Sequence, residues 1–114
     1  MSTAQPTMQS TLENTLMPSE ATEVAAELKG KVRCVVVTPE RAVLDTTAYM
    51  AVLPMFDGEL GVLLGRAPLI GRLGAGELRL KTDGVVTKRL FVEPGFVQVR
   101  RNVVTVLTAA AREA

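Results

Sequence analysis

Glycine is concentrated in one stretch of this chain, LPMFDGELGVLLGRAPLIGRLGAG at residues 53–76, which holds six of the nine glycines. Glycine takes positive φ at no steric cost, so this density predicts sharp bends and close backbone approaches, and we expect positive φ at Gly61 and Gly65. Apolar residues between the glycines are expected to point into a core, which would make the stretch a largely buried corner. These residues are Leu60, Val62, Leu63, Leu64, Leu69, Ile70 and Leu73.

Short β-rich segments separated by turn residues fill the chain from residue 32 onwards, with no convincing long helix among them. Their spacing predicts an all-β fold, a small β-sandwich of about nine or ten short strands. We expect residues 31–110 to form this domain, residues 1–30 a flexible or partly helical N-terminal extension, and residues 111–114 a short C-terminal tail. The expected strands include residues 32–38, 42–46, 48–53, 77–81, 85–92, 96–100 and 103–107.

The turn at Thr82-Asp83-Gly84 leaves two registers open for the hairpin around it. A two-residue Asp-Gly loop sets Leu78 against Arg89, whereas a three-residue loop with a glycine bulge sets Leu80 against Val86. The second register also pairs Glu77 with Arg89, and we prefer it, although it turns Lys88 towards the apolar side. In the last hairpin, Asn102 is expected to take positive φ.

Catalytic chemistry finds little support in the composition. The chain has no histidine, which removes the commonest general base and metal ligand, and its single cysteine, Cys34, is best explained as a buried structural residue. Asp57 and Glu59 flank a turn glycine, and we interpret them as solvated carboxylates of that turn. A net charge of +1 and sparse aromatic residues argue against nucleic-acid binding. We therefore expect no catalytic residues, no cofactor and no metal, in a soluble intracellular protein.

Three motifs occur in order along the chain: TPERAVLD, GELGVLLGRAPLIGRL and FVEPGFVQV. Together they resemble the N-terminal domain of the F-type ATP synthase epsilon subunit, over Lys31 to about Ala110. The family usually has proline where this chain has Leu64, histidine where it has Arg66, and glycine where it has Pro94. These departures bear on local loop shape and contacts rather than on the fold.

The resemblance implies a non-catalytic central-stalk subunit that links the gamma subunit to the c ring and couples proton or sodium flow to ATP synthesis. It implies a peripheral location on the cytoplasmic face of the bacterial inner membrane, or of another energy-transducing membrane. By motif match, Glu59 would face the ring. The partner-interface residues implied in this way are Glu59, Gly65, Arg66, Ala67, Pro68 and Leu69.

Two other readings of the sequence stay open: a stand-alone β-sandwich that binds a small ligand, and a small enzyme with an unrecognised site. The lack of histidine counts against the enzyme, and the scarcity of aromatic side chains counts against the ligand-binding module. Only seven residues follow Leu107, whereas the family continues into a C-terminal helical hairpin. We accordingly expect a subunit that couples but neither inhibits through that hairpin nor binds ATP.

Overall fold

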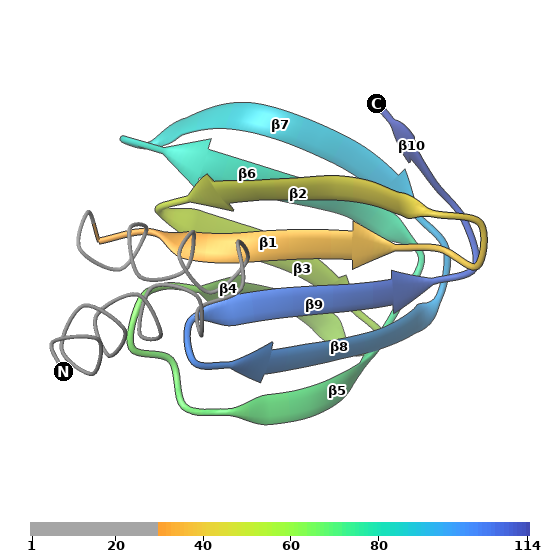
Figure 1. Ribbon diagram of the computed structural model, residues 1–114, viewed down its shortest axis with the longest axis horizontal. Helices are drawn as coiled ribbons and strands as arrows, with labels where there is room; N and C mark the ends of the chain where they lie inside the picture. Colours follow the sequence, from red (N-terminus) through yellow and green to blue (C-terminus); the bar gives the residue numbers. More distant parts are fainter. Residues whose placement is uncertain (1–29) are drawn as a thin grey trace, which may run out of the picture.

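The computed structural model describes residues 30–114, which form ten β-strands and no helix (Figure 1). The interpretation of the N-terminal extension therefore lies outside the described residues. The strands are β1 Val32–Val37, β2 Ala42–Ala48, β3 Met50–Met55, β4 Gly58–Val62, β5 Leu69–Leu73, β6 Gly76–Thr82, β7 Val85–Val92, β8 Gly95–Arg100, β9 Val103–Thr108 and β10 Ala111–Glu113.

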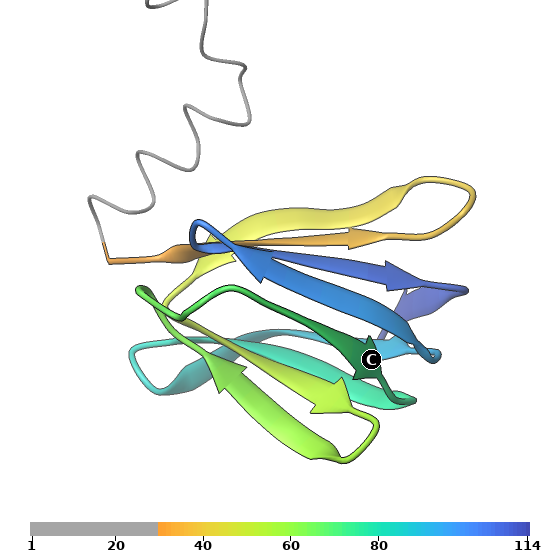
Figure 2. The same cartoon turned by 90° about the horizontal axis from the view of Figure 1, so that it is seen from below.

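The strands follow the order β10-β7-β6-β3-β5-β8-β9-β1-β2, with β4 paired to the free side of β3. Between β3 and β5 the register holds a single pair, Met55 with Leu73, so the sheet folds over at this point into two layers (Figure 2). One layer contains β10, β7, β6, β3 and β4, and the other contains β5, β8, β9, β1 and β2. All neighbours are antiparallel except β1 and β9, which run parallel. This architecture confirms the predicted all-β sandwich.

The core lies between the two layers and is built from alternate residues of each strand, as the period of a β-strand requires. In β1, for example, Val32, Cys34 and Val36 are fully buried while the residues between them are half-buried. Burial raises the pKa of the Cys34 thiol to about 12, and the nearby Asp45 carboxylate adds to the shift. Cys34 is therefore an inert core residue, which confirms its interpretation from sequence.

The glycine-rich stretch differs from the predicted buried corner. Val62 and Leu73 are buried, but Leu63, Leu64 and Ile70 are 53%, 40% and 79% exposed. Residues 63–68 leave the sheet after the edge strand β4, so no second layer lies over them. The prediction of positive φ is right at Gly65, at +86°, and wrong at Gly61, which takes ordinary strand geometry as the partner of Val52.

The preferred register of the β6–β7 hairpin is wrong. Leu78 lies opposite Leu90, and Arg79 lies opposite Arg89. Asp83 and Gly84 form a two-residue turn with both φ angles positive, and an irregularity between Leu80 and Lys81 then shifts the pairing by one residue. Because the bulge lies in the strand rather than at the turn, Leu78 lies beside Leu90 on the core-facing side of the same layer.

The last residues of the chain are not the short tail expected from sequence. Ala111–Glu113 form β10, which pairs with β7 from Ala111 opposite Val92 to Glu113 opposite Leu90. The Lys88 ammonium lies 2.5 Å from the Glu113 carboxylate at this edge, and the bridge lowers the pKa of Glu113. Lys88 stands opposite Leu80 at the sheet rim.

Candidate partner interface

The loop at residues 63–68 is the most exposed part of the glycine-rich stretch, yet its backbone is fixed. The Gly65 N–H donates to the Asn102 side-chain oxygen at 2.7 Å, across 37 residues of sequence. The Arg66 N–H donates to the Leu63 carbonyl at 3.2 Å, which closes a turn around Gly65. Because the loop is held in this way, Leu63, Leu64 and Arg66 are displayed from a defined backbone.

The loop lies at the same end of the sandwich as the β8–β9 turn, on the left of Figure 1. Arg101 and Asn102 form that turn with positive φ angles of 51° and 63°. Asn102 was expected to have this geometry, and its side chain provides the contact with Gly65. Arg100 and Arg101 are exposed beside the loop that carries Arg66.

The carboxylate of Glu59 is held by an ion pair rather than free in solvent. Its two oxygens each lie 3.1 Å from a guanidinium nitrogen of Arg79 on β6, and Glu77 lies 3.7 Å from the same guanidinium. The Glu59 hydrogen bond is the main cause of the raised pKa of Arg79. This arrangement fixes the direction of the Glu59 side chain, which remains about half exposed.

The six residues expected at a partner interface do not form one cluster. Gly65, Arg66, Ala67 and Pro68 share the exposed loop, and the half-buried Leu69 begins β5 beside it. Glu59 instead lies near the start of β4, next to the β3–β4 turn, which Figure 2 places at the opposite end of the sandwich.

A second exposed apolar surface covers the outer face of β5, β8 and β9. Phe96 lies between Arg72 on one side and Leu107 on the other, and Phe96 and Leu107 are each more than half exposed. The Arg72 guanidinium lies 5.0 Å from the centre of the Phe56 ring. Sequence reasoning missed this face, although the alternation of Phe96, Gln98 and Arg100 with buried valines marks those residues as pointing outward.

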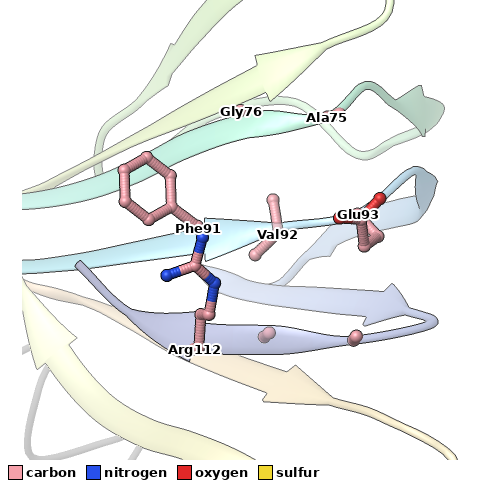
Figure 3. Close-up of a pocket in the computed structure, with 8 residues that line it drawn as sticks. Ala75, Gly76, Phe91, Val92, Glu93 and Arg112 are labelled. Carbon is pink, nitrogen blue, oxygen red and sulfur yellow. The ribbon is translucent and has the colours of Figure 1, made fainter.

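A cavity of about 230 Å³ lies between β10 and the adjoining ends of β6 and β7 (Figure 3). Its walls are mostly small or apolar, with Glu93 at one side and the Arg112 guanidinium stacked 5.0 Å from the Phe91 ring. Within residues 30–114 no three potential metal-ligating side chains come together. Nor does that part of the chain contain a helix able to cross a bilayer.

The structure defines the class of this protein as a rigid β-sandwich domain with exposed loops at both ends and an exposed apolar sheet face. Residues 31–114 match the family described as ATP synthase, Delta/Epsilon chain, beta-sandwich domain, and the chain belongs to that family.

Relatives agree with this membership. The chain is 61% identical over 80 residues to the ATP synthase epsilon chain of Rhodopirellula baltica, which covers 70% of this chain and 62% of that one. It is 48% identical over 77 residues to the epsilon chain of Symbiobacterium thermophilum, covering 67% and 55%. The chain thus spans about 60% of the length of the relatives it matches.

Solved structures share the fold. A chain of the Euglena gracilis mitochondrial ATP synthase, solved with OSCP, F1 and the c-ring, superposes with a TM-score of 0.66 at 21% identity. The match covers 74% of this chain and 54% of that one. A chain of the Tetrahymena thermophila mitochondrial ATP synthase, from its central stalk and c-ring, gives a TM-score of 0.59 at 14% identity, covering 71% and 65%.

Proposed function

We propose that this chain is the non-catalytic central-stalk epsilon subunit of an F-type ATP synthase. In this role it links the gamma subunit to the c ring and so couples proton or sodium translocation to ATP synthesis. The observation that carries the proposal is the 61% identity to the epsilon chain of Rhodopirellula baltica through the folded domain. As part of this proposal, we assign the subunit a peripheral location at the cytoplasmic face of the bacterial inner membrane, or of another energy-transducing membrane.

The two displayed ends suit such a linking role. Glu59, presented next to the β3–β4 turn, is proposed to face the c ring, and residues 65–69 are proposed to contact a partner at the other end. Since β4 runs between these two sites as one hydrogen-bonded strand, a load applied at one end reaches the other through the sheet. A stand-alone ligand-binding module is less favoured, since the cavity between β7 and β10 has few convergent polar groups.

Glu59→Gln tests the ring-facing site, with the full chain added to membranes of the same source from which the native epsilon subunit has been removed. The variant keeps the shape of the side chain and removes its charge. We expect weaker recovery of the c ring, unchanged recovery of gamma, and a melting temperature close to that of wild type, because Glu59 is half exposed.

Glu113→Gln is the matched control, because Glu113 is also an exposed carboxylate in an ion pair, with Lys88 on the edge strand pair. It should bind both partners as wild type does. Equal c-ring recovery by wild type and Glu59→Gln would remove Glu59 from the interface. Failure of the wild-type chain to recover either gamma or c would refute the proposed function itself.

A further inference from the structure

We propose that the end of the sandwich formed by residues 63–68 and the β8–β9 turn binds an acidic amphipathic segment of a partner protein. Carboxylates of that segment would pair with Arg66, Arg100 and Arg101, and an apolar side chain would pack against Leu63 and Leu64. The inference rests on the proposed function only for the source of the partner, which would be a subunit of the ATP synthase stalk.

Unused positive charge is the first observation. Elsewhere in the domain, Arg33 binds both oxygens of Asp45 and Arg79 binds both oxygens of Glu59. Arg72 and Arg112 instead lie against phenylalanine rings. No ion pair within residues 30–114 involves the three arginines of this end, and all three are exposed. They are therefore available to an external carboxylate.

Charge is also distributed unevenly along the molecule. The turns at the opposite end carry exposed Glu40, Asp57 and Glu93. Their charge is offset by the exposed Arg41, Arg72 and Arg112 on and beside those turns. Within residues 30–114, the turns around the arginine-bearing end carry one exposed carboxylate, that of Asp83 in the β6–β7 turn. A partner segment of negative charge is therefore attracted more strongly to the arginine-bearing end, which orients the sandwich as it approaches.

Exposed apolar surface beside these arginines is the second observation. Leu63 also lines a depression of about 310 Å³, open to solvent, whose walls include Tyr49 and Met50, with Lys81 and Asp83 among its polar residues. The space is large enough for an apolar side chain of a partner. Removing apolar surface from water is favourable, so burying the two half-exposed leucines against a partner would strengthen its binding.

Rigidity is the third observation. The contact from Gly65 to Asn102 ties the loop to the β8–β9 turn, so Arg66 and Arg101 project from backbone positions that are fixed relative to each other. A preorganised surface of this kind loses little conformational entropy on binding. A protein segment fits better than nucleic acid, since Tyr49 is the one aromatic side chain lining this end, and single-stranded nucleic acid requires stacking platforms.

The test compares two double variants of the full chain for binding to an epsilon-depleted ATPase complex from the same source, at low and at physiological salt. Arg66→Glu/Arg101→Glu reverses two charges at the proposed site. Arg41→Glu/Arg89→Glu reverses two exposed arginines elsewhere and serves as the matched control. Thermal melts of both variants should stay close to that of wild type.

We expect the site variant to bind at least ten-fold more weakly, chiefly through slower association, and to lose most of the salt dependence of wild type. The control should change affinity by less than three-fold. A photo-crosslinker placed at Leu64 should attach to a segment of the partner that is rich in Asp or Glu. Equal affinity of the site variant and wild type, or crosslinking to a basic segment, would overturn the inference and leave the proposed function standing.

Vesicles of phosphatidylglycerol and phosphatidylcholine form the last arm of the experiment. Wild-type binding to these vesicles that the site variant abolishes, with complex binding unchanged, would assign this end to a membrane surface and refute the protein partner. If the wild-type chain does not bind the ATPase complex at all, the proposed function fails and the inference fails with it.

Discussion

Replacing Gly95 by alanine is the sharpest test of how closely β8 and β9 are packed within their layer. Gly95 begins β8 opposite Thr108 of β9 and opposite Leu73 of β5. A Cβ atom added there would lie 1.9 Å from the Leu107 carbonyl oxygen and 2.9 Å from its carbon. Both are backbone atoms, so the clash cannot be relieved by rotating a side chain.

The cost follows from the distance that the strands must move. To bring the new Cβ to about 3 Å from the oxygen, β8 and β9 must separate by about 1 Å at this point, which lengthens or breaks the flanking ladder hydrogen bonds. Each such bond contributes roughly 0.5–1.5 kcal/mol, and overpacking costs typically about 1–3 kcal/mol. We therefore expect Gly95→Ala to lower the free energy of unfolding by about 3 kcal/mol, a large part of the total for a small domain.

Urea unfolding followed by circular dichroism measures this loss as a lower midpoint with an unchanged slope. Gly61→Ala is the matched control, because a Cβ there would meet the terminal methyl of Met50 at 2.8 Å, and that flexible side chain can move aside. The control should cost about 1 kcal/mol or less. If Gly95→Ala cost no more than Gly61→Ala, the close approach of β8 to Leu107 would be refuted.

Two further predictions concern single polar contacts. Asn102→Gly keeps the positive φ of the turn but removes the acceptor for the Gly65 N–H. Hydrogen exchange of the Gly65 amide should therefore accelerate, while the free energy of unfolding falls by only about 1 kcal/mol. Unchanged protection of this amide would contradict the contact. Hydrogen bonds from Arg33 lower the pKa of Asp45 in the folded protein. The ion pair therefore stabilises the fold above the unfolded-state pKa of about 4, and this stabilisation is lost as the pH falls through the lower folded-state pKa. Asp45→Asn should therefore be less stable than wild type by under about 1 kcal/mol from pH 5 to 8, because the carboxylate is about half exposed. The difference in the free energy of unfolding should vanish in acid. A difference that persisted at pH 2 would exclude the ion pair as its cause.

Much of the fold could be predicted from sequence because the signals are local. Alternation in the strands and turn residues between them are readable within a few residues, and most strand boundaries agree within one or two positions. The hairpin register was not readable in this way. The bulge between Leu80 and Lys81 depends on which leucines meet across the sheet, and turn sequence alone does not specify that.

The candidate site was predictable only in part, because its contacts join distant residues. Asn102 was assigned to a turn, but its bond to Gly65 depends on the loop and the β8–β9 turn lying at the same end. Likewise, the sequence predicted Glu59 to be a solvated carboxylate, because its ion-pair partner Arg79 is twenty residues away in the chain. The three arginines could be seen as exposed charge, but not as neighbours.

The error over Leu63 and Leu64 is informative about function. The apolar residues between the glycines were predicted to be buried, because most such residues pack against an opposing layer of their own domain. Here the chain leaves edge strand β4 and the opposing layer is missing, so both leucines stay in solvent on a backbone pinned by Asn102. The domain is thus complete without them, and their burial is left to an encounter with another surface. Since apolar contact lacks direction, the arginines beside them would supply the orientation, and the leucines would then slow dissociation.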